Sequence, residues 1–210
     1  MNNTFQENET VRMEAFSDGV FAIDITLLTF ELKAPRHPEG DYGNMQLLHA
    51  LFKQWPAYIA FGLSFATIFI IWVNHHRMYN VIRRSDSRFM YYNGLHLLLV
   101  STIPFTTSLM SNYIATEAMT LAGFVYMFLF AGICASLYLM WAHATKDYYL
   151  LKRPAADVKV QTVRMGLVIS IITYVVAALS SLLSPYLSLL IGFGMVVYLS
   201  RLKYHRERVV

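Results

Sequence analysis

Apolar stretches of membrane-spanning length recur along this chain, separated by polar or basic connections. A transmembrane helix needs about 20 predominantly apolar residues, and the repeated stretches are long enough to meet that need. The pattern predicts an all-α polytopic membrane protein that forms one domain over residues 1–210. Six transmembrane helices are expected over residues 11–32, 46–76, 89–109, 118–140, 163–183 and 186–202. Because proline removes a backbone donor, a kink is expected at Pro104 in the third helix.

The first predicted helix differs from the others because polar side chains interrupt it. Asp18 and Asp24 would lie at membrane depth, where ionisable groups usually face a bundle interior or a water-filled path. At 100° per residue, a mainly apolar stripe with one hydroxyl falls on one face of this helix. Its members are Phe16, Gly19, Ile23, Thr26, Leu27 and Phe30. The stripe fits either ordinary helix packing or the lining of a narrow pore that gates by hydrophobic constriction.

Composition and charge support the membrane assignment and give a topology. Hydrophobic residues make up 56% of the chain and charged residues 14%, against roughly 25% charged residues in soluble domains. Of the 17 lysines and arginines, all but Lys33, Arg36 and Lys53 fall on the side that holds both termini. Since basic residues concentrate in cytoplasmic loops, both termini are predicted to be cytoplasmic. The net charge of +4 then reflects topology and contact with anionic lipid rather than nucleic-acid binding.

Polar residues also gather where the first three helices reach the cytoplasmic side. Asp18 needs a partner if it is buried, and the ends of the second and third helices offer donors at the same level. A hydrogen-bonded cluster is therefore expected there, which either supports the structure or sets the angle of the first helix. The adjacent His75 and His76 point about 100° apart on a helix, so they make a poor metal-binding pair. No metal site is predicted, and the single Cys134 allows no intrachain disulfide.

Three stretches together resemble a known family. Arg12 to Asp18 matches an R-x-x-x-F-S-D signature, Trp72 to Arg77 reads W-V-N-H-H-R, and the third helix carries Asn93 and the run Pro104 to Thr107. In this order, on these helices, they are similar to the lysosomal and bacterial potassium channels called transmembrane protein 175. The resemblance covers nearly the whole chain.

The resemblance implies a function and a set of site residues. A homotetrameric, potassium-permeable channel without cofactors is expected, located in the inner (plasma) membrane of a prokaryote and in contact with lipid. The first helix of each subunit would line the pore, with Ile23 as the main constriction, Leu27 and Phe30 continuing it outward, and Thr26 as a hydroxyl linked to ion preference. Family members commonly have an aliphatic residue where Phe30 stands. The expected network that ties the first helix to the second and third consists of Arg12, Phe16, Ser17, Asp18, Trp72, His75, His76 and Asn93.

Other functions remain open from the residues alone. A proton-coupled transporter would use Asp18, Asp24 and His76 as a relay, although no inverted repeat of the kind that transporters use is visible. A membrane enzyme would need a nucleophile or metal constellation, which the sequence lacks, and a non-conducting scaffold is a further alternative. The T-V-G-Y-G loop of ordinary potassium channels is also absent. Glu31 is expected to attract cations at the outer end of the first helix, while Asp24 has no assigned role.

Overall fold

The computed structural model is a bundle of α-helices, and it describes residues 4–35, 43–148, 150–151 and 159–203. The all-α prediction is confirmed, since within these ranges the only extended pairing is an isolated bridge between Ile82 and Leu151. The α-helices are α1 (Thr4–Leu27), α2 (Asn44–Lys53), α3 (Trp55–Tyr79), α4 (Ser87–Val100), α5 (Ile103–Tyr113), α6 (Met119–Ala144), α7 (Val160–Ser181) and α8 (Pro185–Ser200). Two short 3₁₀ helices, η1 (Leu28–Glu31) and η2 (Lys146–Tyr148), follow α1 and α6.

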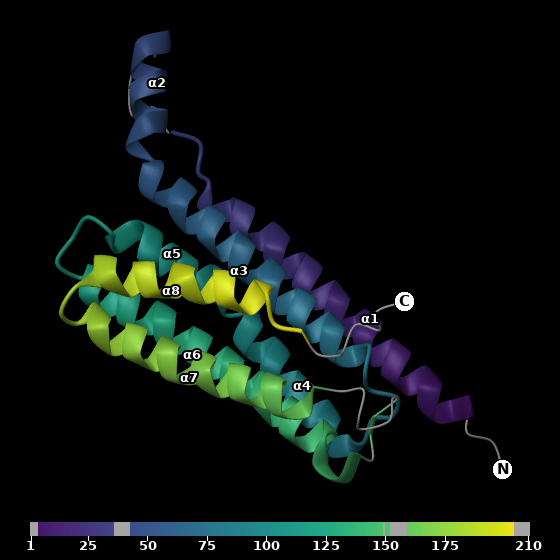
Figure 1. Ribbon diagram of the computed structural model, residues 1–210. Coiled ribbons are helices and arrows are strands. Elements are labelled where there is room, and N and C mark those ends of the chain that lie inside the picture. The colour runs from purple at the N-terminus through teal and green to yellow at the C-terminus, as the bar shows by residue number, and fades with distance from the viewer. Residues whose placement is uncertain (1–3, 36–42, 149, 152–158, 204–210) are drawn as a thin grey trace, which may run out of the picture.

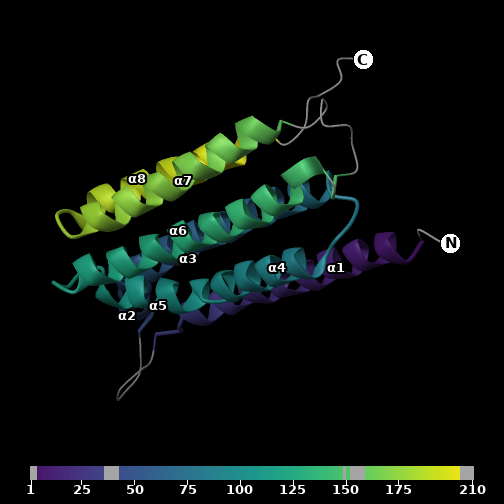
Figure 2. The same ribbon diagram turned by 90° about the horizontal axis from the view of Figure 1, so that it is seen from below.

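The long helices run roughly side by side in layers. Viewed from below, α7 and α8 form one layer, α6 and α3 the middle, and α1 and α4 the opposite side (Figure 2). Helix α6 packs most extensively against α7 and also contacts α4, α5 and α8. Helix α1 lies at the edge, against α3 and α4, and α2 projects away from the bundle (Figure 1).

Among the residues that the structure describes, four segments are long and apolar enough to cross a membrane. They are α3, the segment Ser87–Tyr113 that comprises α4 and α5, α6 and α7. Helix α8 is apolar but shorter, at 16 residues. Helix α1 carries Arg12, Glu14, Asp18 and Asp24, which lower its mean hydropathy below that of the other long helices.

Two of the helices predicted from the sequence are interrupted. Where one helix was expected over 46–76, α2 ends before Gln54 and α3 begins at Trp55, followed by Pro56. The helix expected over 89–109 is likewise divided at Ser101 and Thr102, just before Pro104. Both breaks have the same physical reason, because a proline has no N–H to continue the backbone ladder and fits best in the first turn of a helix.

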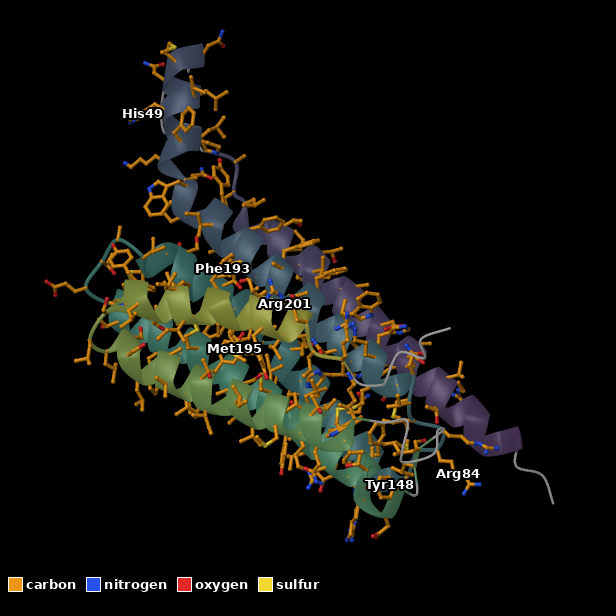
Figure 3. The ribbon with its side chains drawn as sticks, in the orientation of Figure 1. His49, Arg84, Tyr148, Phe193, Met195 and Arg201 are labelled. Carbon is orange, nitrogen blue, oxygen red and sulfur yellow. The ribbon has the colours of Figure 1, made fainter. Side chains whose placement is uncertain are left out.

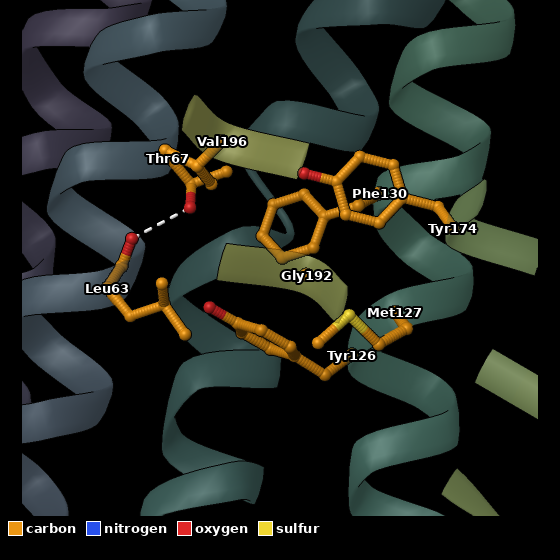
Figure 4. A pocket seen from close by; sticks show the side chains of 8 residues that line it. All are labelled: Leu63, Thr67, Tyr126, Met127, Phe130, Tyr174, Gly192 and Val196. Carbon is orange, nitrogen blue, oxygen red and sulfur yellow. Dashed lines mark hydrogen bonds between the residues drawn. The ribbon is translucent and has the colours of Figure 1, made fainter. Parts of the chain in front are cut away.

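The interior between α3, α6, α7 and α8 is tightly filled (Figure 4). Tyr126, Met127 and Phe130 of α6 meet Tyr174 of α7, and the space where they meet has no room for a water molecule. Gly192 of α8 allows this close packing, because a Cβ atom there would lie 2.5 Å from the Met127 methyl group. Small residues commonly permit such close helix contacts in membrane proteins.

A second close approach joins α6 to α7 and yields a prediction. A Cβ atom added at Gly123 would collide with the Ser181 hydroxyl, which donates a hydrogen bond to the Thr120 carbonyl at 2.9 Å. We expect Gly123→Val to lower the free energy of unfolding by about 1–3 kcal/mol through overpacking. Gly94→Val is the matched control, because nothing lies within 4 Å of a Cβ atom at that helical glycine. Equal thermal midpoints for the two variants in detergent would contradict this packing.

Candidate pore helix and its hydrogen-bond network

Helix α1 has one face buried in its own bundle and one face uncovered. Ser17, Phe21 and Asp24 lie on the buried face, and Leu28 continues it into η1. On the opposite side Ile23 is 59% exposed and Phe30 72% exposed. Phe16, Gly19, Thr26 and Leu27 are also exposed. The mainly apolar stripe expected from the sequence is therefore left uncovered by the single chain.

Thr26 is the one hydroxyl on this stripe. Its Oγ1 donates to the Ile23 carbonyl at 2.7 Å, and the Thr29 hydroxyl repeats the pattern by donating to the Thr26 carbonyl at 2.7 Å. Since a hydroxyl has two acceptor lone pairs, the Thr26 oxygen can still accept a bond or face a cation. The helical geometry also tightens here, because α1 passes into η1 after Leu27.

A buried hydrogen-bonded chain fixes the opposite face of α1. Asn93 of α4 stands at its centre, donating to Ser17 Oγ at 3.0 Å and contacting His75 Nε2 through Oδ1 at 2.9 Å. Ser17 in turn donates to the Met13 carbonyl at 2.8 Å. All three side chains are almost completely buried. The chain therefore connects α1, α3 and α4 through polar atoms that have no access to water.

Asp18 makes a second connection between α1 and α3. The indole of Trp72 donates to Asp18 Oδ1 at 2.8 Å. The Trp72 ring stacks on His76 with the ring centroids 5.7 Å apart, and His76 Nδ1 lies 2.9 Å from Glu14 Oε1. The predicted network residues Ser17, Asp18, Trp72, His75, His76 and Asn93 are thus brought together. Arg12 and Phe16 are exposed, with Phe16 on the uncovered stripe.

The buried chain extends further than the predicted set. His96 stacks on His75 with centroids 5.6 Å apart and planes 6° apart, and its Nδ1 contacts Ser136 Oγ of α6 at 2.8 Å. Phe21 of α1 packs against both histidine rings. His96 follows Asn93 by three residues, so helical spacing puts it on the same face. Ser136 carries no such signal in the sequence.

Asp24 and Glu31 occupy different surroundings along α1 and η1. Asp24 is buried and accepts a hydrogen bond from Ser101 Oγ at 3.3 Å, at the break between α4 and α5. Glu31 lines an open pocket of about 260 Å³ that also contains Lys33 and Lys53. The two lysines offset the negative charge that Glu31 was expected to contribute at this end.

The three members of the proton relay considered above have separate partners. Asp18 bonds to Trp72 and Asp24 to Ser101, while His76 contacts Glu14. Within the described ranges there is also no group of three or more His, Cys, Asp or Glu residues that could hold a metal ion.

Asp86 links α4 to α6 outside the apolar spans. Its carboxylate caps α4 by accepting from the Phe89 amide at 2.8 Å, and it pairs with His143 Nε2 at 2.8 Å. Partial burial raises the pKa of Asp86, but the bonds from Phe89 and His143 lower it by more, so the pKa lies below its usual value of 3.8. The ionised Asp86 carboxylate therefore stabilises the folded state above pH 3.8, and this contribution to the free energy of unfolding is lost as the pH falls through the lower folded-state pKa.

Substitutions at Asp86 separate the cap from the charge. We expect Asp86→Ala to cost about 1 kcal/mol of unfolding free energy at neutral pH, because both the cap and the contact with His143 are lost. Asp86→Asn keeps a capping side chain and should cost less. Thermal midpoints in detergent measure both variants. The difference in thermal midpoint between the wild type and Asp86→Asn should shrink below about pH 4. A difference that does not change with pH would contradict the role given to the Asp86 carboxylate.

Fold and site together define a polytopic membrane protein in which an edge helix is fixed on one side by buried polar contacts and uncovered on the other. The sequence profile of the endosomal/lysosomal potassium channel TMEM175 family matches residues 12–104. A potassium channel of Chamaesiphon minutus is 38% identical over 193 residues, covering 92% of this chain and 94% of the relative. This chain belongs to the TMEM175 family, whose members are ion channels and not enzymes.

Further relatives agree with this membership. A potassium channel of Streptomyces collinus is 40% identical over 144 residues, or 68% of each chain. The crystal structure described as a lysosomal potassium-selective channel TMEM175 homolog from Chamaesiphon minutus matches with a TM-score of 0.81 at 37% identity. The match covers 92% of this chain and 97% of the chain in that crystal structure. The human endosomal/lysosomal proton channel TMEM175 is 33% identical over 97 residues, but these make up only 19% of its length.

Proposed function

We propose that this chain is one subunit of a potassium-permeable channel whose pore is lined by α1. The observation that carries the proposal is the contrast between the two faces of α1: buried polar contacts hold one face, and the other face is an uncovered, mainly apolar stripe. Two relatives that align over two thirds or more of this chain are named potassium channels. These two lines of support agree with the resemblance noted in the sequence.

A single helix cannot enclose a pore, so the channel is an assembly of subunits. In the proposed homotetramer, four α1 helices surround the axis and turn Ile23, Leu27 and Phe30 toward it. Such a constriction passes ions only when it widens and becomes wetted. Thr26 offers an oxygen to the ion at the same level, and the cluster around Asn93 sets the position of α1.

The proposed topology counts six membrane crossings by α1, α3, the α4–α5 segment, α6, α7 and α8. Both termini then lie in the cytoplasm, because this arrangement collects most lysines and arginines on one side. The chain forms one domain in the inner membrane of a bacterium. It binds lipid and permeant potassium, with no cofactor and no nucleic acid.

Cysteine substitution tests whether α1 lines the pore. Ile23→Cys is combined with Cys134→Ser to remove the buried native thiol. Silver ions, which react with thiols, are expected to block most of the potassium flux through the Ile23→Cys protein in liposomes. Val176→Cys on α7 is the matched control, since Val176 is 51% exposed in the single chain, close to the 59% of Ile23. Equal block in both variants, or none at Ile23→Cys, would contradict the pore assignment. Native mass spectrometry of the same samples should give four subunits.

A further inference from the structure

A groove runs between α3 and α8 on the outside of the bundle. Its volume is about 480 Å³, and its walls are apolar except for one tyrosine hydroxyl. The residues that form it include Ile59, Gly62 and Ala66 of α3 and Tyr186, Leu190 and Phe193 of α8. Figure 3 shows Phe193 on the side of α8 toward α3. The groove is separate from the uncovered stripe of α1.

The groove exists because two small residues on α3 face bulky residues on α8. Gly62 and Ala66 are one helical turn apart and therefore share a face. A Cβ atom at Gly62 would meet nothing within 4 Å, so the space beside it is open. Across the groove, Leu190 and Phe193 remain 67% and 58% exposed. This side of α8 is thus uncovered, whereas Gly192 on the same helix packs closely against Met127.

Polar contacts hold α8 to α3 at the opposite end of the helix pair. Asn74 Nδ2 donates to the Leu199 carbonyl at 3.1 Å, and Arg77 donates to the Leu202 carbonyl at 2.8 Å. The groove residues lie nearer the start of both helices, at Trp55 and Pro185. The two helices are therefore tied at one end and leave a gap at the other.

The surroundings and the volume of the groove indicate which kind of molecule can occupy it. Helix α3 is a candidate membrane span, so the groove lies at a depth where the surroundings are hydrocarbon. A volume of 480 Å³ falls within the roughly 300–1,000 Å³ of ligand pockets. An α-helix with side chains is about 10–12 Å across with a 5.4 Å pitch, so one turn needs on the order of 400–600 Å³. The groove therefore has room for a single linear chain, whereas a helix from a second copy could place only side chains of one face in it.

We propose that the α3–α8 groove is a binding site for one acyl chain of a membrane lipid. Tyr186, in the first turn of α8, places its amphipathic ring where aromatic side chains favour the headgroup level. From there the acyl chain runs along Gly62 and Ala66 and fills the space between α3 and α8. Since the groove walls carry no charged side chain, the site recognises the chain and not the headgroup. This site is independent of whether the channel conducts potassium.

Photolabelling of the full-length protein tests the site. The probe is a phosphatidylcholine that carries a diazirine on one acyl chain, mixed into phosphatidylcholine liposomes that contain the protein. Mass spectrometry should find label on both α3 and α8 groove residues at severalfold higher density than on exposed Ile172 and Val176 of α7. Gly62→Leu fills the groove and should reduce this label about tenfold, equivalent to about 1.4 kcal/mol of binding free energy. Gly194→Leu is the control, because a Cβ atom there also meets nothing within 4 Å and Gly194 lies outside the groove.

Three results would overturn the proposal. Label no denser in the groove than on α7 would mean ordinary lipid contact. Dense label that Gly62→Leu leaves unchanged would place the chain elsewhere. A Gly62→Cys thiol, in a Cys134→Ser background, that a lipid-soluble maleimide labels only after the oligomer is dissociated would mean that a second copy covers the groove. Folding of Gly62→Leu is checked by its thermal midpoint against that of Gly194→Leu.

Discussion

Ile23→Asn is expected to raise the potassium flux through the reconstituted protein and to weaken its discrimination against sodium. Ile23 lies on the uncovered face of α1, and four copies would meet at the narrowest part of the proposed pore. An apolar constriction resists wetting, and four amides at that level lower the barrier to water and ions. We expect an increase of at least about tenfold, which corresponds to about 1.4 kcal/mol of barrier. The measurement is flux into liposomes under a potassium gradient, repeated in sodium.

The control for this substitution keeps the apolar surface. Ile23→Leu has the same number of carbon atoms and should leave the flux near the wild-type value. Unchanged flux in Ile23→Asn, with the oligomer intact, would mean that Ile23 lies outside the conduction path. The uncovered stripe would then serve ordinary helix packing, the other interpretation that the sequence allowed.

Asn93→Leu is expected to cause the largest loss of stability among the polar substitutions. The change removes the donor to Ser17 and the contact with His75 Nε2 while nearly preserving side-chain volume. An unsatisfied buried polar group costs about 1–3 kcal/mol, so a total loss of about 2–4 kcal/mol is expected. Because the contact also positions α1, the potassium flux should change as well. Thermal unfolding in detergent and liposome flux measure the two effects.

Two further variants make the Asn93 prediction specific. Asn112→Leu is the control, because Asn112 is exposed and, among the residues that the structure describes, bonds only to Ser108 of its own helix. A change within about 0.5 kcal/mol is expected. In the double variant His75→Phe with Asn93→Leu, both partners are apolar, and the loss should be smaller than the sum of the single losses. Additive losses would show that the two side chains are not energetically coupled.

Periodic features of the fold could be read from the sequence, because a helix repeats every 3.6 residues. The stripe from Phe16 to Phe30 is an example, since spacing alone groups its members and the structure leaves them on one exposed face. The two interruptions were harder to place. Pro104 indicated a kink, but the helix divides at Ser101 and Thr102, and the break before Pro56 was not expected.

The partners within the polar cluster depend on tertiary packing, which spacing does not encode. The sequence indicated that Asp18 needs a partner, but several side chains at the same level were equally suitable. The structure selects the Trp72 indole, because α1 packs against α3 and brings the two side chains within hydrogen-bond distance. It also extends the cluster through His96 to Ser136 of α6, which is 40 residues away in the sequence. Asp24 could be assigned a partner only from the structure, which places Ser101 beside it.

The most direct test of the central claim is the flux of potassium into liposomes that contain only the purified wild-type chain. If the chain is a channel subunit, we expect a potassium conductance that exceeds the sodium conductance and is absent from protein-free liposomes. The flux should also not saturate with potassium concentration as transport by a carrier does. Proton flux without potassium flux would assign a different ion to the same pore. No ion flux from intact oligomers would contradict the channel function proposed for this chain.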